Sequence, residues 1–300
     1  MIFRETGEVK DSFYVLGSTR NPIYLLKSSR PVLFDAGLAV LAPAYEKEIR
    51  AVLHATPPEM ILLTHVHFDH CGAVSYLKSA FPGLKVAASK KAGEIMKRPN
   101  AVRLMRHLSE KAGEALEDFQ EVSPLPRPFE PFEPDLILKE GDVIELEADL
   151  HIEVLATPGH TWDFLSYYVP EKRILVASEA AGCAVNSEHI SIDCLTDFDT
   201  YWRSLTRLAA LDADILCQGH MFVYDGEDVS RFLERSMAAT LQFRGMVEDL
   251  WRSEKGDVRR VMMRIKKLEY DPLPLPKQPE AAYLANLEAR VKGVLGAKGP

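Results

Sequence analysis

Residues 64–70, Thr-His-Val-His-Phe-Asp-His, place three histidines and an aspartate directly after the apolar run Met60–Leu63. A run of four apolar residues is typical of a buried strand. On an extended segment, residues two apart share a face, so we expect His65, His67 and Asp69 to project the same way. Neutral imidazoles and a carboxylate are ligands that Zn²⁺ and Fe²⁺ accept. The stretch therefore predicts a metal site at a strand end, and the alternative is a polar strand end with solvated histidines.

Two further histidines follow apolar runs in the same way. His160 belongs to the triplet Pro-Gly-His after Ile152–Leu155, and His220 belongs to the pair Gly-His after Ile215–Cys217. In each case a glycine lets the backbone turn sharply and present the imidazole at the edge of a sheet. Either histidine alone would be an ordinary turn residue, but three strand ends that carry histidine together indicate one site.

Strand and helix signals alternate over the first 225 residues and predict an α/β fold. Two batches of short apolar runs, each followed by helical patterns, fit two packed sheets with helices outside. Residues from about 89 to 122 predict a helical insertion, and the five prolines of Ser123–Pro134 predict an extended connector after it. We expect a domain over residues 1–225 and a helical C-terminal extension over residues 226–300.

The sequence resembles the metallo-β-lactamase superfamily of metal-dependent hydrolases. The matching pieces are the H-x-H-x-D-H block at 65–70, Pro-Gly-His at 158–160, Gly-His at 219–220, and Phe34-Asp35-Ala36-Gly37, which is similar to the family's Asp-x-Gly turn. The resemblance implies an αββα sandwich with two divalent metal ions at one edge, zinc first, with iron or manganese as alternatives. By that analogy His65, His67 and His160 hold one metal, and Asp69, His70 and His220 hold the other.

One position departs from the family pattern. The family places a bridging aspartate after the next strand, where this chain has Glu179 behind the run Ile174–Val176. A glutamate carboxylate sits one methylene farther out, so it could bridge both metals, bind one of them, or lie behind the ligands. We expect Glu179 to coordinate.

The resemblance implies hydrolysis of a small acyl ester or thioester by metal-bound hydroxide, with Asp69 orienting the nucleophile and passing on its proton. The layout is similar to the thioesterase branch that acts in alkylquinolone signal synthesis, because both have a helical insertion and a helical extension. One alternative is an oxidoreductase resembling the persulfide dioxygenases, with a single iron. Another is a regulatory protein that keeps the fold, binds a partner and turns over slowly.

Composition and charge limit the partners. The chain has 36 basic and 44 acidic residues and a net charge of −8, which disfavours nucleic acid. No uninterrupted apolar stretch is long enough for a membrane span, and the first residues lack a signal-peptide pattern. Four widely spaced cysteines do not form a disulfide framework, so we expect a cytoplasmic, reduced protein. A small acyl substrate and a homodimer through the helical extension complete the expected partners.

The insertion and one cysteine have two interpretations each. Leu104, Met105 and Leu108 recur at helical spacing, which favours packing on the core over a lid for an acyl substrate. Cys71 follows His70 directly, but free cysteines are usually buried, so we interpret it as a packing residue rather than a thiolate ligand.

Overall fold

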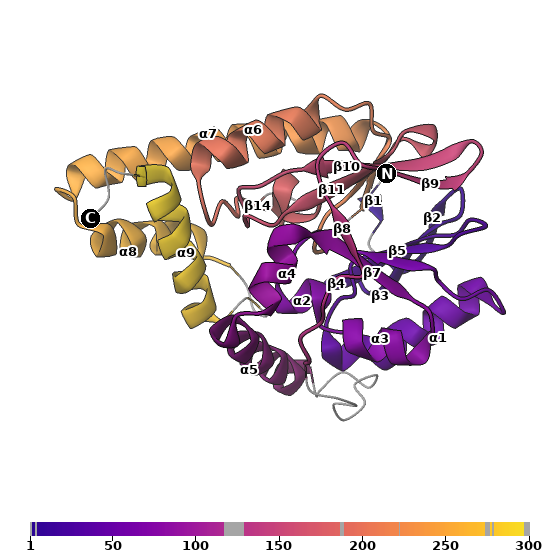
Figure 1. Ribbon diagram of the computed structural model, residues 1–300. Coiled ribbons are helices and arrows are strands. Elements are labelled where there is room, and N and C mark those ends of the chain that lie inside the picture. Colours follow the sequence, from indigo (N-terminus) through magenta and orange to yellow (C-terminus); the bar gives the residue numbers. More distant parts are fainter. Residues whose placement is uncertain are drawn as a thin grey trace. The chain divides into compact units, whose positions relative to one another are not determined.

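The computed structural model in Figure 1 describes residues 2–3, 5–116, 129–186, 189–221, 223–273, 277 and 279–296, without the side chains of 113–116. The chain divides into two compact units that are discontinuous in sequence. Unit 1 comprises Met1–Ala156, Asp163–Ser178 and Asp212–Val229, and unit 2 comprises Thr157–Trp162, Glu179–Leu211 and Ser230–Pro300. Unit 2 thus joins the C-terminal helices to two segments from earlier in the chain, and the expected division at 225/226 stays a prediction.

Unit 1 contains two large sheets of mixed direction. The first has the strand order β2 (Gly7–Lys10), β3 (Phe13–Ser18), β4 (Asn21–Leu26), β5 (Val32–Phe34), β6 (Met60–Leu62), β7 (Lys85–Ser89) and β8 (Leu136–Leu138). Strands β2 to β5 pair antiparallel, and β5 to β8 pair parallel. Parallel neighbours end at the same edge of the sheet, which brings the segments after β5 and β6 together.

The second sheet of unit 1 also has seven strands and combines parallel and antiparallel pairs. Its order is β1 (Ile2–Phe3), β16 (Val223–Asp225), β15 (Ile215–Cys217), β12 (Ile174–Val176), β11 (Leu165–Val169), β10 (Leu150–Ala156) and β9 (Val143–Glu147). Only β12 and β15 pair parallel among these strands.

Strands β1 to β3 were not expected. Strand β3 carries an apolar run, whereas β1 and β2 are short and mainly exposed, which weakens their signal.

The two sheets bury one face of each against the other. In β4, Tyr24 and Leu26 point into the layer between the sheets, and Ile23 and Leu25 point to the opposite face. This alternation follows from the period of two along a strand. The inner layer also contains Tyr167 of β11, which is fully buried. Burying each such side chain contributes about 1.5–3 kcal/mol, so the facing sheets are a main source of stability.

Helices cover the outer face of the first sheet within unit 1. They are η1 (Ala39–Leu41), α1 (Ala42–Leu53), α2 (Phe68–Cys71), α3 (Val74–Ala80), α4 (Lys90–Met96) and α5 (Pro99–Leu116). Helices α4 and α5 form the expected insertion, and Val102 and Met105 of α5 are buried in this outer core. The interpretation as core packing is confirmed for Met105, but it is wrong for Leu104, which is 56% exposed. The expected connector spans residues 123–134. Its first part, residues 123–128, lies outside the described residues, and residues 129–134 form neither helix nor strand.

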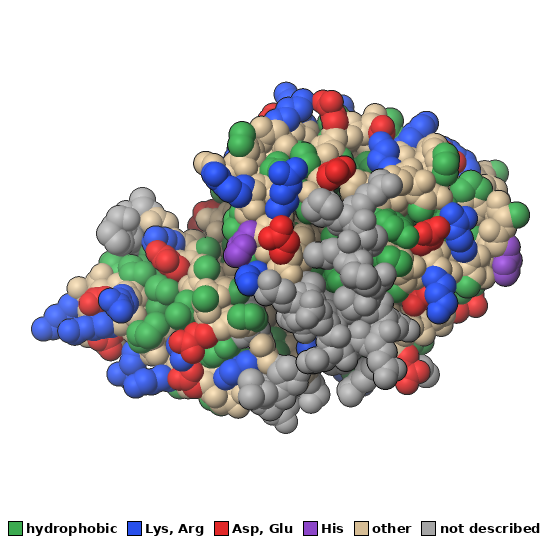
Figure 2. All heavy atoms as spheres, turned by 90° about the horizontal axis from the view of Figure 1, so that it is seen from below, with side chains coloured by type: hydrophobic (Ala, Val, Ile, Leu, Met, Phe, Trp, Pro, Cys, Tyr) green, Lys and Arg blue, Asp and Glu red, His purple; other side chains and the backbone are tan. Residues whose placement is uncertain are grey.

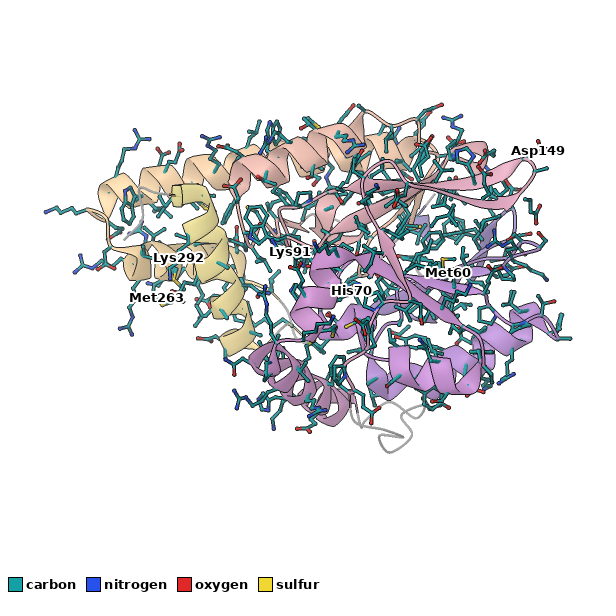
Figure 3. All side chains as sticks on the ribbon, in the orientation of Figure 1. Met60, His70, Lys91, Asp149, Met263 and Lys292 are labelled. Atoms are coloured by element: carbon teal, nitrogen blue, oxygen red, sulfur yellow. The ribbon has the colours of Figure 1, made fainter. Side chains whose placement is uncertain are left out.

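Unit 2 is mainly helical. It contains η3 (Ser178–Ala181, of which Ser178 belongs to unit 1), β13 (Cys183–Ala184), β14 (Ile190–Ser191), α6 (Phe198–Ala209), most of α7 (Glu227–Ser253), α8 (Val258–Glu269) and α9 (Glu280–Leu295). Phe243 of α7, Ile265 of α8 and Leu287 of α9 belong to one buried cluster. Met263 and Lys292, labelled in Figure 3, lie on the exposed sides of α8 and α9. The predicted helical extension therefore has its own core.

The described surface mixes residue types. On the face shown in Figure 2, basic and acidic side chains are interspersed with hydrophobic ones. Among the described helices, none combines the length and the apolar composition that crossing a membrane requires.

Candidate metal centre

The predicted histidine block lies where β6 ends and α2 begins. His65 follows the strand and is 1% exposed, and His67 is still extended, with φ −74° and ψ 152°. Helix α2 starts at Phe68, so Asp69 and His70 are helical residues. The expectation that Asp69 continues the extended face of His65 and His67 is wrong, because the chain turns into this helix one residue earlier.

Asp35 holds His70 in a defined orientation. It follows β5, is 3% exposed, and has a φ of 62°, a left-handed conformation that aspartate tolerates. His70 Nδ1 lies 2.8 Å from Asp35 Oδ2, while the Thr64 N–H donates to Asp35 Oδ1 at 2.7 Å. A carboxylate accepts the proton at Nδ1, so the lone pair of His70 is at Nε2, where a metal ion would bind. His70, a residue of α2, is labelled in Figure 3.

The Thr64 hydroxyl also fixes His65. Its oxygen lies within 3.0 Å of both Asp35 oxygens and 3.0 Å from His65 Nδ1. The hydroxyl has one proton, which goes to the carboxylate, so His65 Nδ1–H donates to Thr64. The lone pair of His65 is therefore at Nε2, and the ring stacks on Phe164 with centroids 4.7 Å apart.

His65 and His67 turn ring nitrogens toward each other. His65 Nε2 and His67 Nδ1 are 2.9 Å apart. Two lone pairs at this distance need a proton or a cation between them. Ligands on one zinc ion with bonds of ~2.1 Å lie about 3.0–3.4 Å apart at angles of about 90–109°. The distance between His65 Nε2 and His67 Nδ1 is thus close to the one that two ligands of a shared cation require.

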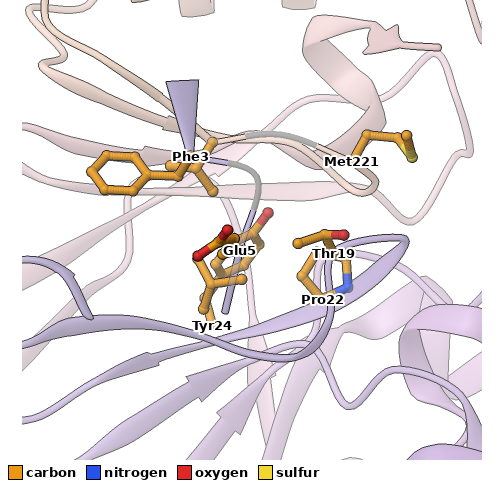
Figure 4. A pocket seen from close by; sticks show the side chains of 8 residues that line it. Phe3, Glu5, Thr19, Pro22, Tyr24 and Met221 are labelled. Atoms are coloured by element: carbon orange, nitrogen blue, oxygen red, sulfur yellow. The ribbon is translucent and has the colours of Figure 1, made fainter. Parts of the chain in front are cut away.

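His220 is held by the backbone of a neighbouring turn. Its Nδ1 lies 2.7 Å from the carbonyl oxygen of Arg20, which accepts the proton and leaves the lone pair at Nε2. The Met221 N–H donates to Thr19 O at 2.7 Å, and the Tyr24 hydroxyl donates to Gln218 O. Figure 4 shows Thr19 and Met221 lining a small hollow beside this loop. The loop after β15 is thereby fixed on both sides of His220.

Asp69, His70 and His220 form one cluster of metal-ligating atoms. Each offers an atom within 4.8 Å of the other two, and Asp69 Oδ2 lies 3.7 Å from His220 Nε2. Imidazole nitrogens with fixed lone pairs and a carboxylate are the donor set of Zn²⁺, Fe²⁺ or Mn²⁺ sites, so these residues fit such an ion. The structure brings together five of the seven expected site residues in unit 1: His65, His67, Asp69, His70 and His220.

The other two expected residues belong to unit 2. The Pro-Gly-His turn is tight, since Gly159 has a φ of 138° and a Cβ there would lie 2.4 Å from Tyr201 Cα. His160 follows with Nδ1 2.7 Å from Asp193 O, which places its lone pair at Nε2. Glu179 lies in η3, is 3% exposed, and its carbonyl accepts from the Tyr201 hydroxyl at 3.1 Å. Ligation by His160 and Glu179 stays a prediction.

Cys71 is a packing residue. Its side chain is fully buried in the outer core of unit 1. Burial raises the pKa of the Cys71 thiol well above its usual value, and the charge of Asp69 adds to this. The full burial of Cys71 among apolar side chains confirms the interpretation as a packing residue.

The groups that hold the histidine rings were not predicted, as two of them illustrate. Asp35 was recognised only as part of a turn motif. It comes one residue after β5, which pairs with β6, and this position is the sequence signal that could have revealed its contact with His70. The carbonyl of Asp193 is a backbone group, which any residue supplies, so the sequence holds no sign of it.

Comparison with known proteins identifies relatives. A family model described as the metallo-beta-lactamase superfamily matches residues 19–220, which is more than half of the chain. An acyl-coenzyme A thioesterase, MBLAC2, from Gallus gallus is 27% identical over 187 residues, covering 57% of this chain and 61% of that protein. A hydroxyacylglutathione hydrolase from Rhodopseudomonas palustris is 30% identical over 195 residues, covering 63% and 59%. The matches thus span about three fifths of these relatives.

Solved structures share the fold. A metallo-beta-lactamase family protein from Thermus thermophilus has a TM-score of 0.64 at 22% identity, covering 96% of this chain and 94% of that one. An archaeal metallo-beta-lactamase superfamily protein from Sulfolobus tokodaii has a TM-score of 0.59 at 15% identity, covering 95% and 99%. The predicted fold class is confirmed.

Proposed function

Because this chain belongs to the metallo-β-lactamase superfamily, we propose that it is a dinuclear metal-dependent hydrolase of a small acyl thioester or ester. The observation that carries the proposal is the cluster of Asp69, His70 and His220 beside the facing nitrogens of His65 and His67. The two relatives described above support the thioester, since their names describe acyl groups on coenzyme A or glutathione.

On the family pattern, His65, His67 and His160 would hold one cation and Asp69, His70 and His220 the other. Glu179 would add a second carboxylate. When bound, two divalent cations lower the pKa of a water molecule and stabilise charge that develops on a carbonyl oxygen. Zinc is the first candidate, and the same donor set of nitrogen and carboxylate oxygen also fits iron or manganese.

The residues of this chain orient the donors and move a proton. Asp35, Thr64 and Arg20 place lone pairs at Nε2 of His70, His65 and His220, so no ring has to turn when a cation arrives. Asp69 Oδ2 faces the site and can accept a proton from an attacking water, then release it to the departing thiolate or alkoxide, which leaves as the thiol or alcohol. With two dications bound, Asp69 and Glu179 would leave the site with a positive net charge, which would favour an anionic transition state.

Elemental analysis of protein purified without chelators or added metal tests the proposal first. About two zinc, manganese or iron ions per chain are expected, and one iron per chain would favour the persulfide dioxygenase alternative. Little metal after reconstitution would favour a binding protein. Oxygen uptake with glutathione persulfide separates the oxygenase independently.

A thioester panel then tests the reaction. Acyl-coenzyme A and acylglutathione substrates release a thiol that a chromogenic disulfide detects. We expect hydrolysis by the native chain, its loss in His70→Ala, and its retention in His107→Ala, which changes an exposed histidine on α5. Equal rates in the two variants would refute the proposed site.

A further inference from the structure

The loop between β14 and α6 holds the His160 turn. His160 Nδ1–H donates to Asp193 O at 2.7 Å, and both the N–H and the hydroxyl of Thr196 donate to Gly159 O, at 3.1 and 2.8 Å. Ser191 steadies Asp193 from the other side, because its hydroxyl donates to Asp193 Oδ1 at 2.9 Å. The orientation of the imidazole therefore depends on where the backbone of residues 193–196 lies.

The C-terminal helix α9 packs directly on this loop. Gly293 is buried, and a Cβ built on it would lie 3.4 Å from Cys194 O, 3.5 Å from Cys194 Sγ and 3.6 Å from Thr196 O. A single methyl group fills that space, and a larger side chain would displace the loop. Glycine is a poor helix former, so its place within α9 indicates a packing requirement.

Arg290, one turn before Gly293, attracts the same loop. Its side chain is 5% exposed, lies 3.1 Å from Glu269 Oε2, and stacks over Phe243 at 4.1 Å. Burial lowers the pKa of Arg290, but the charges of Glu269 and Asp193 more than offset this, so its pKa is raised. Arg290 thus stays charged and favours the negative Asp193 nearby. Cys194 adds no charge, because burial and Asp197 raise the pKa of its thiol to about 12.

We propose that α9 is a positioning element for the predicted metal ligand His160, with Gly293 and Arg290 as the positioning residues that act through the backbone of Asp193–Thr196. The inference rests on the proposed function in one respect, that His160 ligates a cation. It goes further by making the C-terminal helix necessary for the affinity of that cation. A ligand whose supporting hydrogen bond is disturbed typically loses metal affinity about 10- to 100-fold.

Titration with Co²⁺ tests the proposal on the whole 300-residue chain. The readouts are the visible absorbance of bound Co²⁺, the number of ions bound, and their affinities in competition with a chromophoric chelator. Gly293→Leu is the test variant and His160→Ala the reference for loss of the ligand. Gly245→Leu is the matched control, since Gly245 lies within α7 and a Cβ there meets nothing within 4 Å.

We expect the native chain and Gly245→Leu to bind two ions and His160→Ala to bind one tightly. Gly293→Leu should bind one ion as the native chain does and the other at least about tenfold more weakly. Native affinity for both ions in a folded Gly293→Leu overturns the proposal and leaves the proposed function intact. If Gly293→Leu does not fold, Asp193→Asn decides, because it keeps the carbonyl that accepts from His160 and an oxygen that can accept from Ser191 but removes the charge that attracts Arg290.

For Asp193→Asn, a severalfold loss confined to the same ion supports the proposal, and native affinity overturns it. Failure of the premise gives a different result. If His160→Ala binds both ions as the native chain does, or if the native chain binds none, the proposed ligand set itself is wrong and the role of α9 falls with it.

Discussion

Replacing Asp35 by asparagine is expected to weaken metal binding without unfolding the chain. Asparagine has the same shape and tolerates the left-handed φ of 62°. Its oxygen can still accept from Thr64 N, the contact now made at 2.7 Å, but its amide nitrogen then faces His70 Nδ1. The amide donates, so His70 must accept at Nδ1 and carry its proton at Nε2, the atom that a cation needs.

The magnitude follows from that proton. To bind a cation, His70 must move the proton back to Nδ1, where no acceptor remains, and it forgoes a hydrogen bond to a charged group. Such bonds contribute about 1.5–3 kcal/mol. At about 1.4 kcal/mol per factor of ten, the affinity for one ion should fall about 10- to 150-fold. The metal-free stability should change by less than about 1.5 kcal/mol, because the ring can adopt the other tautomer.

Chelator competition measures the affinity, and urea unfolding of the metal-free protein measures the stability. Asp135→Asn is the control, since Asp135 also accepts a backbone N–H, from Val86 at 2.8 Å, but its other partner is Lys78. Native metal affinity in Asp35→Asn would refute the reasoning. So would an equal loss in Asp135→Asn, because the effect would then not depend on the histidine.

Four further outcomes are expected. Glu179→Ala should lower the number of metal ions bound per chain by elemental analysis, and an unchanged number would remove Glu179 from the ligand set. Chelation should lower the melting temperature, because an ion at about 100 times its Kd that binds only the folded chain stabilises it by about 2.7 kcal/mol; identical melting curves would contradict this. Arg290→Met should lower the free energy of unfolding by about 3–5 kcal/mol in urea, since Glu269 would be left without its partner, and a loss below about 1 kcal/mol would count against the pair. Finally, the pKa of the Cys194 thiol is raised from 9.0 to about 12, so the unfolded chain loses this proton first and the free energy of unfolding should fall as pH rises from about 9 toward about 12. Cys194→Ala should flatten that fall in unfolding curves measured between about pH 8 and pH 10. An equal slope in the native chain and the variant would contradict the assignment.

Inner strands and the histidine block could be predicted from the sequence because their signals are local. Strands β5, β12 and β15 begin and end with their apolar runs, since a strand buried on both faces has no polar positions. The exposed edge strand β2 lacks such a run. The start of α2 was misplaced because histidine and aspartate fit either an extended segment or a first helical turn.

Other features of the site depend on contacts that the sequence does not express. Asp35 and His70 are 35 positions apart, and they meet because β5 and β6 are parallel neighbours. Gly293 and the His160 turn are far apart along the chain and meet only through the loop that carries Cys194. Pairing of distant segments is set by the whole fold, so residues that support a ligand are harder to predict than the ligand itself.

Two chemical kinds of group accept hydrogen bonds from the histidine rings, and substitutions at the two kinds of position should be tolerated to different degrees. The acceptors for His160 and His220 are the carbonyls of Asp193 and Arg20, and every amino acid supplies a carbonyl. Codon changes at position 20 should therefore be widely tolerated in a saturation library selected for metal binding. Position 35 must provide an anionic acceptor at a left-handed backbone, so few substitutions should survive there. Backbone carbonyls that fix the tautomer of a histidine therefore leave no trace in a survey of side-chain conservation.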